Sequence, residues 1–118
     1  MTGEVTIYYN PRCSKSRATL ELLREQGIEP NIIEYLKTPP SRAELTRILN
    51  MLGMEPRELM RSKETEYREQ GLDNPDLKQK DLVKAMHDTP KIMERPIVVA
   101  NGKAALGRPP EQVLEILD

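Results

Sequence analysis

The only cysteine of the chain, Cys13, lies in a segment whose residue types suit anion chemistry. Residues 10–17 read Asn-Pro-Arg-Cys-Ser-Lys-Ser-Arg and separate a β-branched, aromatic run from a run with helical periodicity. The start of a helix presents unpaired N–H groups and partial positive charge, yet this one carries Arg12, Lys15 and Arg17 rather than acidic residues. Such surroundings lower the pKa of a thiol and bind anions. The segment therefore predicts a nucleophilic thiolate inside an oxyanion site; the alternative is a small buried cysteine beside solvated cations.

The spacing around Cys13 excludes two known kinds of cysteine site. The loop of low-molecular-weight phosphatases needs Cys-x5-Arg, but the sixth residue after Cys13 is Thr19. Ser16 occupies the position that would complete Cys-x-x-Cys. Because the chain has no second cysteine, an oxidised or covalently modified Cys13 must be resolved by a thiol from another molecule. We therefore expect an external thiol donor.

The composition restricts the compartment and the class of partner. The 118 residues correspond to a single domain, residues 1–118, and one cysteine cannot form an internal disulfide, which favours a reducing, cytoplasmic environment. The formal net charge of −1 gives no indication of nucleic-acid binding. No run approaches the roughly 18 apolar residues that span a bilayer, so we expect no membrane partner. The lone His87 cannot form a metal site, and we expect no metal and no bound cofactor.

Two kinds of periodicity predict the elements that must position Cys13. The β-branched and aromatic runs at residues 5–9 and 31–36 predict strands. The run between them predicts a helix that begins at Ser14 and stops at Gly27. Its apolar stripe would contain Ala18, Leu20, Leu22 and Leu23. Cys13 is therefore expected at the junction of a strand and the helix that follows it.

The rest of the chain predicts a helical insertion followed by a hairpin. In the insertion we expect a helix opened by a Ser41–Glu44 capping box and closed by Gly53, then a short helix from Pro56, then a helix capped by Asp81. The hairpin would consist of strands at residues 96–100 and 103–107 joined by an Asn101-Gly102 turn. A last helix is expected over residues 110–117. In this last helix Val113, Leu114 and Leu117 would face inward. The order predicts an α/β fold: a small mixed four-stranded sheet flanked by helices, with a right-handed βαβ crossover and a helical insertion.

Three segments together resemble the glutathione/glutaredoxin-coupled arsenate reductases. They are residues 10–17, the Glu-Arg-Pro-Ile-Val-Val run at residues 94–99, and the Gly-Arg-Pro-Pro-Glu run at residues 107–111. The chain is most similar to the short bacterial arsenate reductase-like branch of this family. The resemblance extends from about residue 4 to residue 118 and implies a thioredoxin-like fold with a helical insertion, in agreement with the predicted order of elements.

The resemblance also implies a function and a set of site residues. Cys13 would be the catalytic nucleophile, Arg61, Arg95 and Arg108 would bind the oxyanion, Ser16 and Arg17 would lie beside it in the loop, and Pro96 would be the cis-proline opposite the cysteine. The implied reaction is the reduction of arsenate to arsenite, with glutathione as co-substrate and glutaredoxin as protein partner. Tyr9 occupies the position of a histidine that helps to keep the cysteine ionised in the best-known members.

Two other functions stay open at the level of the sequence. A thiol transferase acting on glutathione mixed disulfides, or a non-enzymatic redox or transcription-regulatory protein, would use the same fold. Arg61 lies in a highly charged segment and would then be a solvated helix residue. Arg95 and Arg108 would then be paired with Glu94 or Glu111. Arginines that converge on one tetrahedral anion favour arsenate, so the sequence predicts an arsenate reductase.

Overall fold

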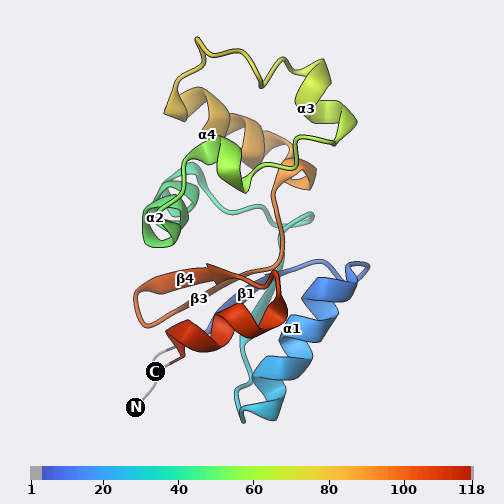
Figure 1. Ribbon diagram of the computed structural model, residues 1–118, viewed down its shortest axis with the longest axis vertical. Coiled ribbons are helices and arrows are strands. Elements are labelled where there is room, and N and C mark those ends of the chain that lie inside the picture. Colours follow the sequence, from blue (N-terminus) through green and yellow to red (C-terminus); the bar gives the residue numbers. More distant parts are fainter. Residues whose placement is uncertain (1–3, 118) are drawn as a thin grey trace. The chain divides into compact units, whose positions relative to one another are not determined.

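The computed structural model of the chain describes residues 4–117, which fall into two units. One unit contains the segments up to Thr38 and from Arg95 onward, and the other is Pro39–Glu94. The described strands all belong to the first unit, and the second unit is helical (Figure 1). The two ends of the predicted domain, residues 1–3 and 118, lie outside the described residues.

The first unit is built on a mixed sheet with the strand order β2-β1-β3-β4. Its strands are β1 (Thr6–Tyr9), β2 (Asn31–Glu34), β3 (Ile97–Ala100) and β4 (Lys103–Leu106). β1 and β2 are parallel and are joined through α1 (Ser14–Glu25), whereas β3 pairs antiparallel with both β1 and β4. The predicted parallel pair and hairpin are therefore confirmed.

Two turns set the ends of these strands. Asn101 (φ 55°) and Gly102 (φ 72°) both have left-handed backbone conformations, as a two-residue turn between β3 and β4 requires. β2 ends at Glu34, two residues before the predicted end. The Glu34 carbonyl accepts hydrogen bonds from the backbone N–H groups of Lys37 and Thr38 (both 2.9 Å). These bonds turn the chain away from the sheet.

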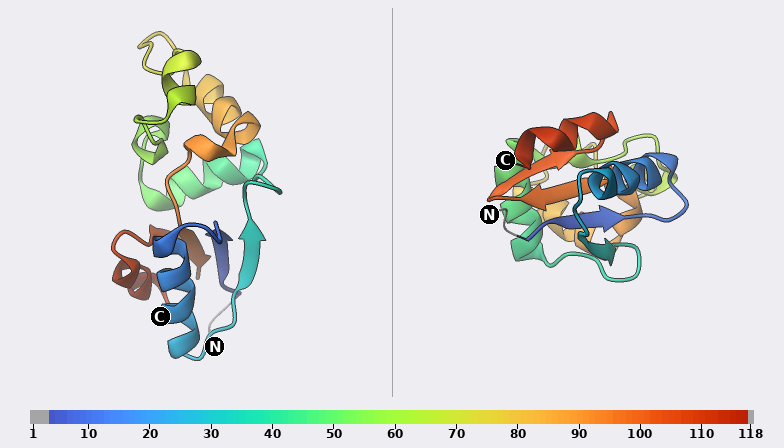
Figure 2. Two further views of the ribbon diagram at one scale, coloured as in Figure 1. Left: turned by 90° about the vertical axis from the view of Figure 1, so that its right-hand side faces the viewer. Right: turned by 90° about the horizontal axis from the view of Figure 1, so that it is seen from below.

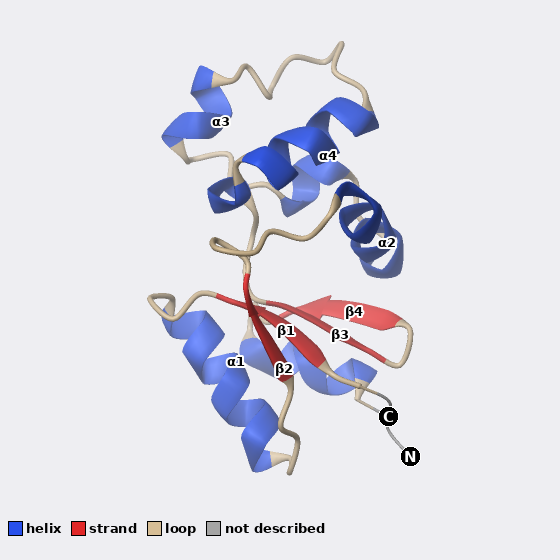
Figure 3. Cartoon of the chain, turned by 180° about the vertical axis from the view of Figure 1, so that it is seen from behind, coloured by secondary structure: helices blue, strands red, loops and turns tan. Residues whose placement is uncertain are grey.

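Two helices, α1 and the 3-10 helix η3 (Pro110–Ile116), cover the same face of the sheet (Figures 1 and 3). Figure 2 (right) looks onto this face, with both helices in front of the strands. The core beneath them contains Val5, Ile7, Leu20, Leu23, Val98, Ala100, Val113 and Ile116. Burial of this apolar surface is the main force that holds α1, and with it Cys13, in place.

The buried faces of the two helices differ from the predicted ones. In α1 the buried residues are Ser16, Thr19, Leu20 and Leu23; Ala18 is exposed and Leu22 half-buried. In η3 the fully buried residues are Val113 and Ile116; Leu117, just after the helix, is half-buried and packs against the same core, as predicted, whereas Leu114 is half-buried and is not part of this cluster. The reason is geometric: a 3-10 helix has three residues per turn, so residues three apart lie on the same face.

The second unit consists of short helices (Figure 3), and its buried residues include Leu45, Leu49, Leu59 and Met86. They are α2 (Arg42–Leu52), η1 (Pro56–Leu59), α3 (Thr65–Glu69), α4 (Gln79–Asp88) and η2 (Pro90–Ile92). The capping box of α2 is confirmed: the Ser41 hydroxyl accepts from the Glu44 N–H (3.1 Å), and the Glu44 carboxylate accepts from the Ser41 N–H (3.4 Å). α2 ends at Gly53 in the left-handed conformation, as predicted.

The start of α4 and its one histidine differ from expectation. α4 begins at Gln79, so Asp81 lies inside its first turn and is not the cap. The Asp81 carboxylate instead accepts a hydrogen bond from the backbone N–H of Lys78 (2.9 Å), which satisfies one of the donors at the helix start. Nδ1 of His87 donates to the carbonyl of Pro40 (2.8 Å) and so links α4 to the segment before α2.

Candidate active site at Cys13

Cys13 lies at the N-cap of α1, where the chain passes from β1 into the helix. Its backbone is extended (φ −95°, ψ 122°), and the residue is 8% exposed. The turn before it is closed by two hydrogen bonds to Asn10: the Cys13 N–H donates to the Asn10 carbonyl (3.0 Å), and the Arg12 N–H donates to Asn10 Oδ1 (3.0 Å). Asn10 therefore fixes the loop that presents the thiol to the positive end of the helix.

The surroundings of Cys13 favour the thiolate. Burial raises the pKa of the thiol, but this effect is outweighed, and the pKa lies below its ordinary value. In order of size, the opposing causes are the backbone N–H of Ser16, the Ser16 hydroxyl, the backbone N–H of Lys15 and the charge of Arg95. Donors to the charged form stabilise it, so a larger fraction of Cys13 is ionised at neutral pH than of an ordinary cysteine.

Ser16 connects the loop and the thiol. It is fully buried on the inner face of α1, and its hydroxyl accepts a hydrogen bond from the Asn10 N–H (3.3 Å). The same hydroxyl contributes to lowering the pKa of Cys13. Since a hydroxyl both accepts and donates, it can serve both neighbours at once. The structure therefore places Ser16 against the sulfur.

Replacing Ser16 with alanine is expected to raise the pKa of Cys13, because one donor to the thiolate is lost. A smaller fraction of Cys13 is then ionised at neutral pH, and the rate of alkylation by iodoacetamide should fall severalfold. The pH dependence of this rate measures the change. Ser14→Ala is the matched control, since Ser14 is an exposed serine of the same helical turn; equal alkylation profiles for the two variants would contradict the role of Ser16.

Arg95 brings positive charge to the sulfur and keeps unused hydrogen-bond donors. Its charge is one of the causes that lower the pKa of Cys13. Its Nε and Nη1 atoms are buried and have no hydrogen-bond partner among the described residues. Leaving buried donors of a charged group unsatisfied costs free energy, so this guanidinium is suited to an anionic ligand. The bond between Arg95 and Pro96 is cis, as predicted from the resemblance.

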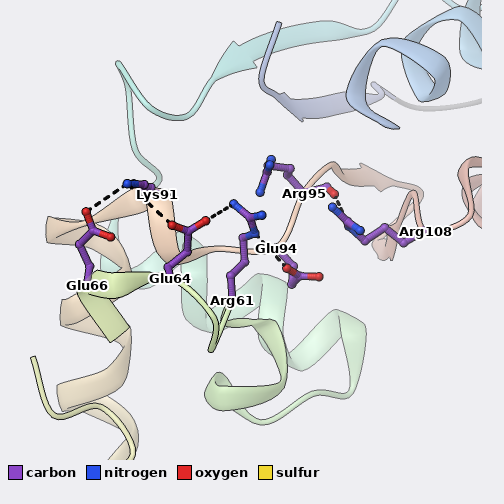
Figure 4. Close-up of polar contacts among 7 residues, drawn as sticks. All are labelled: Arg61, Glu64, Glu66, Lys91, Glu94, Arg95 and Arg108. Atoms are coloured by element: carbon purple, nitrogen blue, oxygen red, sulfur yellow. Dashed lines mark hydrogen bonds and ion pairs between the residues drawn. The ribbon is translucent and has the colours of Figure 1, made fainter. Parts of the chain in front are cut away.

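Arg108 and Arg17 are both predicted site residues whose donors contact backbone carbonyls. Nε of Arg108 donates to the carbonyl of Arg95 (2.8 Å) (Figure 4). Nη1 of Arg17 donates to the carbonyl of Pro11 at the surface (2.9 Å). Each side chain therefore holds a segment of backbone near Cys13. The bond between Arg108 and Pro109 is a second cis peptide, which the sequence did not predict.

Arg61 belongs to the second unit and lies in a chain of ion pairs (Figure 4). Nη1 of Arg61 contacts Glu64 (2.7 Å) and its Nε contacts Glu94 (3.4 Å). Glu64 also contacts Lys91 (3.7 Å), which in turn contacts Glu66 (3.2 Å). The alternative that Arg61 is a solvated helix residue is wrong, because it lies outside the helices and its side chain is 28% exposed.

Glu94, which the sequence offered as a partner of Arg95, thus forms an ion pair with Arg61. Two carboxylates at one guanidinium fix its orientation and offset much of its charge. An oxyanion at Arg61 would have to compete with them. The role of Arg61 in oxyanion binding stays a prediction from the resemblance.

Two residues near the site were missed from the sequence. Thr19 is fully buried, and its hydroxyl donates to the carbonyl of Lys15 (2.7 Å), back toward the start of α1. Gly107 packs so closely against Thr19 and Pro96 that a Cβ atom would lie 2.7 Å from Pro96 Cγ and closer still to Thr19 Oγ1. A signal for Thr19 was present, because Ser16, Thr19, Leu20 and Leu23 follow the i, i+3, i+4, i+7 spacing of a buried stripe. For Gly107 no local signal exists.

Residues 4–117 contain no group of histidine, cysteine, aspartate and glutamate side chains that could hold a metal ion. In the same range, none of the helices is long and apolar enough to cross a membrane.

Comparison with known proteins places the chain in a well-defined group. The model of the ArsC family matches residues 8–116. An arsenate reductase of Neisseria meningitidis is 52% identical over 115 residues, which cover 97% of this chain and 98% of the relative. The uncharacterized protein YfgD of Escherichia coli is 59% identical over 118 residues, covering 99% of each chain. The solved structure of an arsenate reductase from Vibrio cholerae is 56% identical, covers 97% of this chain and 98% of its own, and superimposes with a TM-score of 0.94. The predicted thioredoxin-like fold is thereby confirmed.

Proposed function

The chain belongs to the ArsC family, and we propose that it reduces arsenate to arsenite, with Cys13 as the nucleophile and glutathione and glutaredoxin as thiol donors. The observation that carries the proposal is the pairing of Cys13 with Arg95. A sulfur poised as thiolate lies within the field of a guanidinium that has two buried donors without a partner among the described residues. Arsenate brings both an electrophilic centre for the sulfur and oxygen atoms for those donors.

The first step joins Cys13 to arsenic. The Cys13 thiolate attacks arsenate, an S–As bond forms, an As–O bond breaks, and the oxygen leaves as water after protonation. Arsenic stays in its pentavalent state. Arg95 offsets the negative charge on the remaining oxygens, and the N–H groups of Lys15 and Ser16 favour the ionised sulfur before the attack.

The two electrons come from two external thiols, because the chain has no second cysteine. The thiol of glutathione displaces a second oxygen as water and gives a Cys13–As–glutathione species. The glutaredoxin thiolate then attacks the glutathione sulfur. A glutaredoxin–glutathione disulfide forms, the electron pair of the S–As bond stays on arsenic, and arsenic becomes trivalent. Water replaces Cys13 on the trivalent arsenic, which releases arsenite and restores the thiolate.

The test is arsenite formation by the purified chain, measured by chromatographic separation of the two arsenic species. Turnover should require both glutathione and glutaredoxin, and omission of either donor should reduce arsenite to the level without enzyme. Thioredoxin in place of glutaredoxin is the matched control for the donor. Reduction of a glutathionylated peptide without any arsenite formation would overturn the proposal and assign a thiol transferase instead.

A further inference from the structure

Arg95 and Arg108 make different contacts, although the resemblance gives them the same role. Both precede a cis-proline and belong to the first unit. Nε and Nη1 of Arg95 are buried without a hydrogen-bond partner in the described part of the chain. Nε of Arg108, in contrast, donates to the Arg95 carbonyl at 2.8 Å. One donor of Arg108 is therefore already used to hold the backbone of Arg95.

A second hydrogen bond runs beside the first. The backbone N–H of Gly107 donates to the carbonyl of Pro96 at 3.0 Å. Two adjacent residues, Gly107 and Arg108, thus bind the two adjacent carbonyls of Arg95 and Pro96. The close packing of Gly107 on Pro96 leaves no space for a Cβ atom. We call these contacts the 107–108 clamp.

The clamp acts on the backbone of Arg95 and leaves its guanidinium to other partners. In Figure 4 the Arg108 guanidinium lies at the Arg95 carbonyl, whereas the Arg95 guanidinium points away from Arg108. A held backbone fixes the point from which a long side chain extends. Fewer conformations then have to be lost when an anion binds, so the entropic cost of binding is smaller. Holding the carbonyl therefore prepares the Arg95 side chain for a ligand.

We propose that Arg108 is a positioning residue: through Nε it holds the Arg95 carbonyl, so that the Arg95 guanidinium stays beside Cys13 and takes the oxyanion. The identity of this anion as arsenate rests on the proposed function, but the hydrogen bond and its effect on Cys13 do not. Since the charge of Arg95 favours the thiolate, alkylation of Cys13 reports on the position of Arg95 without any arsenate present.

The test compares Arg108→Gln with Arg108→Met. Both variants lose the positive charge and keep an unbranched chain of similar length. Glutamine carries an N–H donor on Cδ, where arginine has Nε, and methionine carries none. Any difference between the two variants therefore measures the hydrogen bond and not the charge. Iodoacetamide alkylation of Cys13 as a function of pH is the readout, with thermal unfolding as the check that both variants are folded.

We expect alkylation at neutral pH to be about twofold slower in Arg108→Met than in Arg108→Gln, a small change because the charge of Arg95 is the smallest of the causes that lower the pKa of Cys13. In an Arg95→Met background this difference should vanish, because Arg95 carries the effect. Equal alkylation of the two variants with Arg95 present would overturn the proposal, and so would a difference that persists without Arg95. If Arg108→Met does not fold, Arg108→Leu supplies a smaller variant without the donor.

Arsenate binding separates this proposal from the proposed function. Arsenate binding is measured by calorimetric titration in a Cys13→Ser background, where no covalent step occurs. In this background Arg108→Met should bind arsenate several times more weakly than Arg108→Gln. If no variant binds arsenate but the alkylation difference is present, the clamp is retained and arsenate is the wrong anion. If arsenate binds equally well to both and alkylation is also equal, Arg108 has no positioning role.

Discussion

Replacing Cys13 with serine is expected to lower arsenite formation by about a thousandfold or more, because a serine hydroxyl is not ionised at neutral pH and is a far weaker nucleophile. The fold should survive the change. Cys13 is the N-cap of α1, and the N–H groups of Lys15 and Ser16 in the first turn face its side chain. Serine is among the best N-cap residues and can accept from the N–H groups of the first turn, so we expect unfolding stability to be unchanged or raised by up to about 1 kcal/mol.

We therefore expect arsenite formation to fall while the stability of the fold is kept or raised. Arsenite formation with both thiol donors and the thermal unfolding midpoint are measured on the same preparations. Ser14→Ala, one residue along and exposed, is the matched control and should keep wild-type turnover. Turnover by Cys13→Ser at a wild-type rate would remove Cys13 from the mechanism, whereas loss of turnover together with loss of fold would point to a structural role for the thiol.

Replacing Arg95 with lysine is expected to weaken arsenate binding by about 10- to 100-fold, the range given by the loss of one charge-assisted hydrogen bond. Lysine keeps the positive charge but replaces a rigid fork of donors with a single ammonium. Its charge still favours the Cys13 thiolate, so alkylation of Cys13 at neutral pH should change much less than the KM for arsenate. The measurement is KM for arsenate beside the alkylation rate for the same protein.

Arg24→Lys is the control for Arg95→Lys, since Arg24 is an exposed arginine in the last turn of α1, at the opposite end of the helix from Cys13. It should leave both quantities near their wild-type values. An unchanged KM in Arg95→Lys would exclude the guanidinium fork as an arsenate ligand. A fall in alkylation as large as the rise in KM would show that Arg95 acts on the sulfur and not on the anion.

The two predictions separate the parts of the site that the proposed reaction needs. Cys13 supplies the electron pair that forms the S–As bond, and Arg95 supplies donors to the oxygens. In the proposed site Ser16 would act on the sulfur and Arg108 on the Arg95 backbone, through the contacts described above. The loss expected on mutation is accordingly larger for Cys13 and Arg95 than for Ser16 and Arg108.

Patterns between close neighbours in the chain were sufficient for much of the fold. The capping box of α2, the Asn101-Gly102 turn and the position of Cys13 at the start of α1 were all predicted correctly. Each depends on backbone preferences or hydrogen bonds within a few residues, so the local sequence contains the whole cause. Local patterns fail at η3, where the prediction of an α-helix instead of a 3-10 helix placed Leu114 inward and missed the buried Ile116.

The residue types available to the site follow from the sequence: one thiol, a helix start without acidic residues, and arginines before two prolines. The contacts of each arginine within its unit, in contrast, depend on the tertiary structure. Arg61 is held by Glu64 and Glu94, Arg108 by the Arg95 carbonyl, and Arg95 keeps buried donors without a partner among residues 4–117. The reason is physical: a long charged side chain pairs with whatever lies within about 3 Å of its end, and the folded chain brings there residues that are distant in the sequence.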